Sequence, residues 1–331
     1  MLLYVVAFVL SSVFALFWTP VMRRAALQLG VVDRPDGRLK NHVEETPYLG
    51  GLAVFTAFLL TVGVLTEFEQ ETLGLLLSGT IVLLVGLIDD FGALTPYQKL
   101  LGQTLAALVL VKSGTYIKLE FLPLYVAIPL TVLWILAVTN ALNIIDILDG
   151  LAAGVASIAA ISIAIANSMA GRDSVAFLAI VLAGACVGFL RHNFQPARIY
   201  LGDTGSLFIG FMLAALSMNA GYTRINLLAV ISPVLILGIP LFDLVFVMYV
   251  RWRKGIPMTK GSPDHFALRL RRCKLSVRET AVTTYVLTAI LCAAALAMSQ
   301  VQLEWAVATM GGIVSMGFVI AYLLMKVDMT A

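Results

Sequence analysis

Residues 72–90 read TLGLLLSGTIVLLVGLIDD, and this stretch decides the fold. No charged residue lies between its start and the pair Asp89 and Asp90 that ends it. A helix that crosses the hydrocarbon core of a bilayer needs about 20 mainly apolar residues. We therefore expect residues 72–88 to form a membrane span, and the same test applied along the chain predicts the rest of the architecture.

The whole chain has the composition of a membrane protein. Hydrophobic residues make up 60% and charged residues only 12% of the 331 residues, against about 25% charged residues in soluble domains. We expect an all-α polytopic integral membrane protein with about 11 transmembrane helices (10–11). The predicted spans are roughly 1–22, 50–66, 72–88, 98–113, 122–139, 151–170, 174–190, 205–221, 225–250, 280–299 and 303–325. A soluble enzyme, a disordered chain and a secreted disulfide scaffold are excluded, and the three cysteines form no CxxC pair.

The distribution of basic residues predicts the orientation. The first span has no basic residue before it and is followed by Arg23 and Arg24, so we expect a retained span with its N-terminus outside. With that choice, 18 Lys and Arg residues fall on the inner side and 4 on the outer side. Basic residues favour the cytoplasmic side of membrane proteins. We therefore expect an outer N-terminus and a cytoplasmic C-terminus.

Polar residues capable of chemistry gather on the predicted cytoplasmic side. They are Asp89, Asp90, Asn140, Asn143, Asp146, Asp149, Asn193, Asp203 and all three histidines. This one-sidedness predicts a reaction at the cytoplasmic leaflet. An ion-coupled transporter, the alternative from another class, would place acids near mid-span. Only Asp243 lies well inside a span, and we expect it to pair with a neighbouring helix.

Two of the inner segments carry closely spaced carboxylates. Asp89 and Asp90 end a helix, where the helix dipole disfavours anions, so we expect a metal ion, Lys99 or both to compensate. The segment NALNIIDILDG places polar residues three apart at 140, 143, 146 and 149. They can share a face only if the helix tightens or breaks near Gly150. A solvated acidic helix end and helix capping are the structural alternatives.

Three further inner segments offer ligands for an anionic substrate. Asp203 begins a span, where it could cap the helix or bear a divalent ion, and Asn193 and Arg198 precede it as candidate substrate contacts. In the loop 251–279, His265 and Arg269 are four residues apart and suit a diphosphate. The first inner loop adds Lys40 and His42.

Taken together, these segments resemble the polyprenyl-phosphate N-acetylhexosamine-1-phosphate transferase family. The matching motifs are the DD pair with Lys99, an NxxNxxDGxDGL segment at 140–151 and an NFxPAxxFxGDxGS segment at 193–206. Two departures stand out. Ile147 replaces the first glycine of the second motif, and the HFALR stretch at 265–269 replaces a histidine-rich HxHHR.

The resemblance implies a reaction and its partners. A UDP-N-acetylhexosamine would meet undecaprenyl phosphate at the bacterial inner membrane and yield an undecaprenyl-diphospho-sugar and UMP. This would be the first membrane step of cell-envelope polysaccharide synthesis. Within the family, the sequence is most similar to the branch that transfers N-acetylglucosamine-1-phosphate (GlcNAc-1-phosphate). The peptidoglycan branch, which transfers phospho-N-acetylmuramoyl-pentapeptide, is the alternative. Membrane lipids are further partners and nucleic acid is not expected, while a homodimer is left open.

The resemblance also implies roles for individual residues. Mg²⁺, with Mn²⁺ as a substitute, would be held by Asp203 and Asn143. The catalytic residues would be Asp89, Asp90 and Asp203, and either Asp89 or Asp90 would orient or deprotonate the lipid phosphate. The expected substrate-binding residues are Lys99, Asn140, Asp146, Asp149, Asn193, Arg198, Tyr200, His265, Arg269, Lys40 and His42. We expect one transmembrane transferase domain over 1–331. Its active site is formed by cytoplasmic loops at about 23–49, 89–99, 140–150, 191–204 and 251–279.

Overall fold

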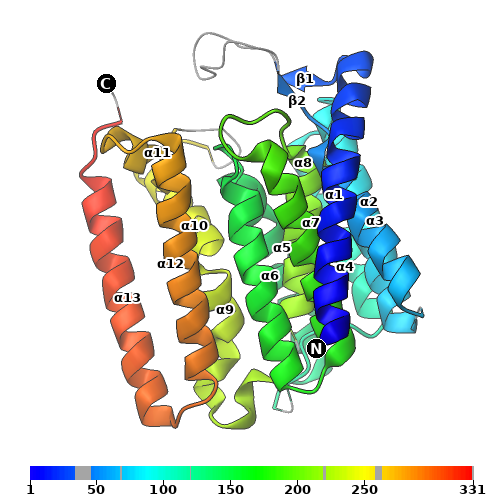
Figure 1. Cartoon of the computed structure of the whole chain (residues 1–331). Coiled ribbons are helices and arrows are strands. Elements are labelled where there is room, and N and C mark those ends of the chain that lie inside the picture. Colours follow the sequence, from blue (N-terminus) through cyan, green and yellow to red (C-terminus); the bar gives the residue numbers. More distant parts are fainter. Residues whose placement is uncertain (34–45, 68, 120, 219–220, 258–262, 330–331) are drawn as a thin grey trace.

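The structure is a computed structural model of the chain and describes residues 1–33, 46–67, 69–119, 121–218, 221–257 and 263–329. It is a bundle of helices with one two-stranded sheet in these residues (Figure 1). In chain order the elements are α1 (Leu2–Leu29), β1 (Val32–Asp33), β2 (Thr46–Pro47), α2 (Gly50–Leu65), α3 (Gln70–Asp90), α4 (Pro96–Lys112), α5 (Leu124–Ile145), α6 (Leu151–Met169), α7 (Asp173–Asn193), α8 (Gly202–Ser217), η1 (Tyr222–Arg224), η2 (Leu227–Ile231), α9 (Ser232–Ile236), α10 (Gly238–Lys254), α11 (Phe266–Arg272), α12 (Val277–Met298) and α13 (Leu303–Met325).

The all-α polytopic fold class is confirmed, whereas the count of about 11 spans is not. Among the described residues, seven helices are long and apolar enough to cross a bilayer: α1, α3, α5, α6, α7, α12 and α13. A bent pair makes the count up to eight if it is one span. Two further apolar helices, α2 and α8, have 16 residues each. At 1.5 Å per residue they measure about 24 Å, less than the roughly 30 Å of a hydrocarbon core.

The stretch 225–250, predicted as one continuous span, is broken. Residues Leu227–Ile236 and Gly238–Lys254 meet at an angle of 77°. Pro233 and Gly238 lie beside the break, and proline and glycine both weaken continuous helix. A break of this kind at membrane depth is tolerated where the backbone is covered by protein. The break directs α10 towards the end of the molecule that carries β1, β2 and α11 (Figure 1).

Helix α8 lies at the centre of the core. Every one of its residues except Asp203 is buried, and it packs against α2, α3, α5 and α6. Glycines permit this close packing: a Cβ on Gly86 of α3 would come within 2.4 Å of the Asp203 carbonyl oxygen. One on Gly51 of α2 would come within 2.1 Å of the Gly205 nitrogen. Small residues let membrane helices approach in this way, and here they set the position of Asp203.

The helix ends bring the predicted chemistry to one end of the bundle. Helices α3 and α5 end there, whereas α4 and α8 begin there, so their terminal residues meet. Helix α4 begins with a capping box, in which Thr95 and Gln98 satisfy each other's backbone N–H groups. That cap fixes the first turn, from which Lys99 projects. The start of α1 lies at the opposite end of the bundle from the end of α13 (Figure 1).

Candidate active site

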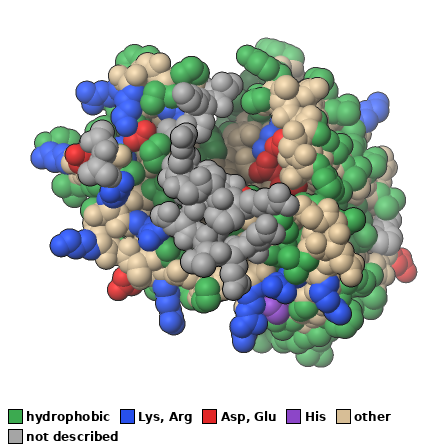
Figure 2. Space-filling view, turned by 90° about the horizontal axis from the view of Figure 1, so that it is seen from above, with side chains coloured by type: hydrophobic (Ala, Val, Ile, Leu, Met, Phe, Trp, Pro, Cys, Tyr) green, Lys and Arg blue, Asp and Glu red, His purple; other side chains and the backbone are tan. Residues whose placement is uncertain are grey.

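Lys99 is the centre of the polar cluster. Its Nζ lies 2.9 Å from Asp89 Oδ2, 2.8 Å from Asp203 Oδ2 and 3.2 Å from Asn143 Oδ1. The Asn143 amide also donates to Asp203 Oδ1 and to Ser206 Oγ. Four helices, α3, α4, α5 and α8, therefore supply side chains to a single cluster. Figure 2 looks onto this end and shows acidic and basic side chains together in a hollow.

Asp90 has a different role from its neighbour Asp89. Its carboxylate accepts hydrogen bonds from the backbone N–H groups of Asp203, at 2.7 Å, and Thr204, at 3.1 Å, and from the Thr204 hydroxyl. These N–H groups belong to the first turn of α8, which has no intrahelical acceptors for them. Asp90 thus caps α8 from α3. The alternative that Asp203 is the N-cap of α8 is wrong, because Leu201 holds the N-cap position and Asp203 lies inside the first turn.

The segment 140–150 does not continue as one helix. It breaks before Gly150, which is one of the two conformations that would let its polar residues share a face. Helix α5 ends at Ile145, a turn follows, and Gly150 adopts the left-handed conformation before α6 begins. Within the described part of the chain, the Asp146 carboxylate has neither a hydrogen bond nor an ion pair. Burial, together with the nearby charges of Asp203, Asp90 and Asp149, raises the pKa of Asp146 to about 8. An unpartnered carboxylate among other carboxylates suits a cation.

Other residues of the predicted site bind the protein itself. Asn193 accepts from the Gly150 N–H at 3.1 Å and donates to the Ile199 carbonyl at 3.0 Å. Asp149 accepts from the Ala197 N–H at 2.9 Å. These bonds tie the turn after α5 to the loop before α8. Asn140 pairs with Gln103 of α4, its amide donating to Gln103 Oε1 at 2.6 Å.

Tyr200 and Arg198 come from the loop that precedes α8. The Tyr200 ring lies 5.9 Å from the Tyr48 ring, and its backbone N–H donates to the Pro47 carbonyl. Burial raises the pKa of the Tyr200 hydroxyl, so the phenol stays neutral. Arg198 is exposed, and its carbonyl accepts from Arg23 Nε at 2.9 Å. Lys40 and His42 lie outside the described residues.

His265 and Arg269 are both buried, at 7% and 3% exposure. The Arg269 guanidinium donates to Asp264 Oδ1 and to the carbonyls of Leu324 and Val327. His265 Nδ1 lies 2.8 Å from Asp243 Oδ2. The prediction that Asp243 pairs with a neighbouring element is confirmed. Among the described residues, no hydrogen bond joins either side chain to the Lys99 cluster.

The donor set of the cluster fits a divalent cation. Five carboxylates, those of Asp89, Asp90, Asp146, Asp149 and Asp203, accompany one lysine. No three histidine, cysteine or acidic side chains in the described residues form a metal cage. Mg²⁺ does not need one, because it keeps several waters and takes one or two protein carboxylates plus substrate phosphates. The Asp203 side chain, 30% exposed, is reachable.

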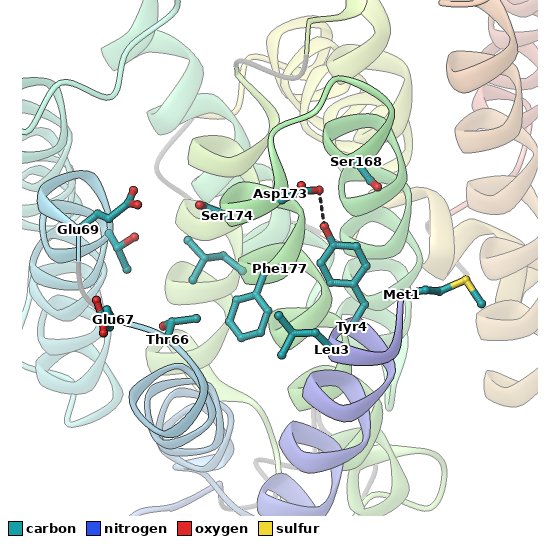
Figure 3. A pocket seen from close by; sticks show the side chains of 12 residues that line it. Met1, Leu3, Tyr4, Thr66, Glu67, Glu69, Ser168, Asp173, Ser174 and Phe177 are labelled. Carbon is teal, nitrogen blue, oxygen red and sulfur yellow. Dashed lines mark hydrogen bonds between the residues drawn. The ribbon is translucent and has the colours of Figure 1, made fainter.

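A cavity of about 480 Å³ opens at the other end of the molecule, beside the N-terminus (Figure 3). Tyr4 donates to Asp173 Oδ1 across it at 2.7 Å, and Glu67 and Glu69 also line it. The described residues that line it include no Lys or Arg. Its acids would repel a diphosphate, so the Lys99 cluster is the candidate site for anionic substrates.

Comparison with known proteins gives the family. The sequence profile of glycosyl transferase family 4 matches residues 72–221. A protein of Bacillus subtilis named "Probable undecaprenyl-phosphate N-acetylglucosaminyl 1-phosphate transferase" is 35% identical over 300 residues, covering 87% of this chain and 82% of the relative. The chain belongs to glycosyl transferase family 4. The matched region holds every member of the Lys99 cluster, and the family predicted from the motifs is confirmed.

Two further relatives differ in the reactions that their names give. A "Decaprenyl-phosphate N-acetylglucosaminephosphotransferase" of Mycobacterium tuberculosis is 34% identical over 299 residues, covering 79% of this chain and 73% of the relative. A "Phospho-N-acetylmuramoyl-pentapeptide-transferase" of Heliobacterium modesticaldum is 36% identical over 242 residues, covering 64% of this chain and 73% of the relative. The N-acetylglucosamine-phosphate transferases therefore match more of this chain than the pentapeptide transferase does.

Several residues of the cluster were not predicted from the sequence. They are Gln103, Thr204 and Ser206, which bond to Asn140, Asp90 and Asn143 respectively. A signal existed for Thr204 and Ser206, since both flank Asp203 in the GDTGS segment. Gln103 lies four residues after Lys99, one helical turn along the same face of α4, and this spacing could have indicated it.

Proposed function

We propose that the protein transfers N-acetylglucosamine-1-phosphate from UDP-N-acetylglucosamine to undecaprenyl phosphate, with Mg²⁺, on the cytoplasmic face of the bacterial inner membrane. The observation that carries this proposal is one lysine held among Asp89, Asn143 and Asp203 at one end of a multi-pass helical bundle. The relatives named as N-acetylglucosamine-phosphate transferases support the sugar and the polyprenyl phosphate acceptor.

The reaction is a phosphoryl transfer with balanced bonds. An oxygen of the lipid phosphate attacks the β-phosphorus of the nucleotide sugar, and a new P–O bond forms. The bond between the β-phosphorus and the bridging oxygen breaks, and UMP leaves with that oxygen. Negative charge develops on the bridging and non-bridging oxygens, so fixed cations stabilise the transition state.

Lys99 is the residue of this chain best placed to supply that cation. Its side chain is 15% exposed, and its ammonium is already oriented by two carboxylates and an amide. Such an arrangement needs little reorganisation when charge develops on a phosphoryl oxygen. Asp203, Asn143 and the unpartnered Asp146 would hold Mg²⁺. Bound there, the ion would supply positive charge against the negative charge of the phosphate oxygens.

Asp89 is the acid that we assign to the acceptor phosphate, because Asp90 is committed to the first turn of α8. A phosphate monoester is largely dianionic at pH 7, since its second pKa is about 6. A strong general base is therefore not required, and Asp89 acts by positioning. Tyr200, with its neutral ring beside the cluster, is assigned to the uridine and sugar pocket.

A donor panel tests the proposal. Purified protein with Mg²⁺ and undecaprenyl phosphate is given UDP-N-acetylglucosamine, UDP-N-acetylgalactosamine or UDP-N-acetylmuramoyl-pentapeptide, and UMP and lipid-linked product are measured. Product from the first donor is expected. Product only from the pentapeptide donor would favour the alternative represented by the Heliobacterium relative. Product from none, with a well-folded protein, would overturn the proposal.

The metal assignment has its own test. Asp203→Asn keeps the size of the side chain and removes its charge, so we expect kcat to fall by at least ~10²-fold, or about 2.7 kcal/mol of barrier. Asp173→Asn, at the opposite end of the molecule, is the matched control. Mn²⁺ titration followed by electron paramagnetic resonance should show weaker binding to Asp203→Asn than to the control.

A further inference from the structure

Ser206 is a fully buried hydroxyl at the edge of the Lys99 cluster. It lies one turn into α8, and its exposure is 0%. Its Oγ lies 2.9 Å from the Asn143 amide nitrogen and 3.0 Å from the Gly202 carbonyl oxygen. The proposed chemistry gives Ser206 no role, yet it contacts Asn143, one of the residues assigned to the cation.

The Gly202 carbonyl fixes the direction of these two hydrogen bonds. A hydroxyl has one hydrogen to donate, and a carbonyl oxygen can only accept. The Ser206 hydrogen therefore goes to Gly202, four residues earlier in the same helix, and Ser206 Oγ accepts from the Asn143 NH₂ group. Serine hydroxyls often bond back to the preceding turn of a helix. Here that bond leaves Oγ as an acceptor for a side chain of α5.

The Asn143 side chain is held with its oxygen on the side of Lys99. Its NH₂ group donates to two acceptors of α8, Ser206 Oγ and Asp203 Oδ1. Both amide hydrogens are thereby used, and Oδ1 is the end that faces Lys99 Nζ, at 3.2 Å. The orientation matters because Mg²⁺ takes oxygen ligands, and an amide turned the other way round would present its NH₂ group instead.

Among these three partners of Asn143, Ser206 is the one that has no part in binding substrate or cation. Lys99 and Asp203 are assigned to the phosphate and the cation, so their bonds to the amide change when these bind. Ser206 is shielded at 0% exposure, and its bond to Asn143 stays within the protein. Residues that orient a metal ligand commonly contribute about 10–100-fold to metal affinity or activity.

We propose that Ser206 is a positioning residue that holds the Asn143 amide with its oxygen towards the divalent cation. The proposal rests on the proposed function, in which Asn143 and Asp203 hold Mg²⁺. It adds an orienting contact from the second turn of α8 to the ligand that α5 supplies. Ser206 itself touches neither the cation nor a substrate.

Ser206→Ala removes the hydroxyl and keeps a good helix former. One amide hydrogen of Asn143 then lacks its acceptor, and the side chain is free to turn. In substrate-free protein, Mn²⁺ followed by electron paramagnetic resonance should bind about 10-fold or more weakly. Ser206→Thr keeps the hydroxyl and should restore at least part of this affinity. The same affinity in Ser206→Thr as in Ser206→Ala would count against a role of the hydroxyl.

The assay should show the same loss as a demand for more metal. The Mg²⁺ concentration that gives half the maximal rate of Ser206→Ala should rise by about 10-fold or more. The change in kcat at saturating Mg²⁺ should be smaller, because Asn143 itself remains. A loss of kcat with an unchanged Mg²⁺ requirement would contradict positioning of a cation ligand.

Ser217→Ala is the matched control. Ser217 is also buried on α8 and donates to the Ala214 carbonyl at 2.9 Å, and in the described part of the chain it bonds to no other side chain. This variant should bind Mn²⁺ like the unmutated protein. Equal weakening in both alanine variants would indicate a general effect on α8 and overturn the proposal, as would unchanged Mn²⁺ affinity in Ser206→Ala.

A double-mutant comparison shows whether Ser206 acts through Asn143. In an Asn143→Ala background, the added change Ser206→Ala should weaken Mn²⁺ binding no further. Losses that multiply would overturn the proposal. No product in the donor panel, together with weaker Mn²⁺ binding in Ser206→Ala alone, would count against the sugar transfer and leave the assignment of Ser206 intact.

Hydrogen exchange of the Asn143 amide needs neither metal nor turnover. The chain has seven asparagines, so ¹⁵N-asparagine labelling gives few side-chain signals in NMR spectra, and Asn143→Ala identifies those of Asn143. Both amide hydrogens should exchange slowly in the unmutated, metal-free protein, and one should exchange faster in Ser206→Ala. Fast exchange of both in the unmutated protein would overturn the proposal, and this result can be obtained even if Ser206→Ala fails to fold.

Discussion

Lys99 Nζ lies 2.8 Å from Asp203 Oδ2, and this contact joins the first turn of α4 to the first turn of α8. The same ammonium lies 2.9 Å from Asp89 Oδ2. Without it, two carboxylates would face each other in a partly buried site, where like charges repel strongly. Lys99 therefore holds the cluster together and is also its source of positive charge.

Lys99→Met should remove activity more than stability. The apolar part of the side chain is kept, but the cation that stabilises the transferring phosphoryl group is lost, so we expect kcat to fall ~10²–10³-fold. Lys99→Arg should recover part of this loss, because the charge remains but its geometry changes. UMP release under saturating substrates is the measurement. Lys112→Met, at the exposed end of the same helix, is the matched control. Equal kcat in both methionine variants would contradict the role.

Asp89→Asn and Asp90→Asn should differ although the residues are neighbours. Asp90 satisfies three donors at the start of α8, and an asparagine can accept from fewer of them. Leaving such a donor unpaired costs about 1–3 kcal/mol, so Asp90→Asn should lower the melting temperature. Asp89→Asn should keep stability and lose kcat. Thermal unfolding and initial rates are measured together, and equal destabilisation of both variants would refute the assignment.

The helices follow from the sequence because apolar length is a local property. Each of the eleven predicted stretches overlaps a helix of the structure, or at 225–250 a broken pair. Hydropathy does not report a bend, since a proline or glycine beside an apolar run is compatible with either a straight or a broken helix. The polar clustering at one end was also predictable, because alternating helices bring every second connection to the same end.

The partners of individual side chains did not follow from the sequence. Consecutive helical residues point about 100° apart, so Asp89 and Asp90 must face different neighbours. Only the packing of α3 decides that Asp89 faces Lys99 and Asp90 faces the start of α8. Asn193 and Asp149 look like substrate contacts, yet both bond to backbone groups. An asparagine that ties two loops together has the same sequence pattern as one that binds a ligand.

Asn193→Ala should therefore act mainly on stability. The Gly150 N–H and the Ile199 carbonyl would lose their buried partner, at about 1–3 kcal/mol for each unsatisfied group. We expect a lower melting temperature and, because both loops border the cluster, a lower kcat. Arg198→Ala, exposed on the same loop, should change stability by no more than about 0.5 kcal/mol. An unchanged melting temperature with a raised KM would indicate a direct substrate contact instead.

The raised pKa of Asp146 predicts how metal-free protein responds to pH. The folded state holds this proton up to pH about 8, whereas an unfolded aspartate releases it near pH 3.9. Between these values the folded state binds more protons, so stability falls as pH rises and levels off above the folded pKa. In EDTA, the melting temperature should fall from about pH 5 to pH 8. Asp146→Asn should flatten this fall, and an equally steep fall in that variant would contradict the assignment.

Cys273 offers a direct test of orientation. It is exposed just after α11, whereas Cys186 and Cys292 are buried, so a membrane-impermeant maleimide should label the native chain at this one cysteine. A cytoplasmic active site predicts labelling in inside-out vesicles and none in intact cells. Glu304→Cys in a Cys273→Ala background places the thiol at the start of α13, at the other end of the bundle from α11 (Figure 1), and should give the opposite pattern. The reverse result for both thiols would place the Lys99 cluster outside, where a cytosolic nucleotide sugar cannot reach it.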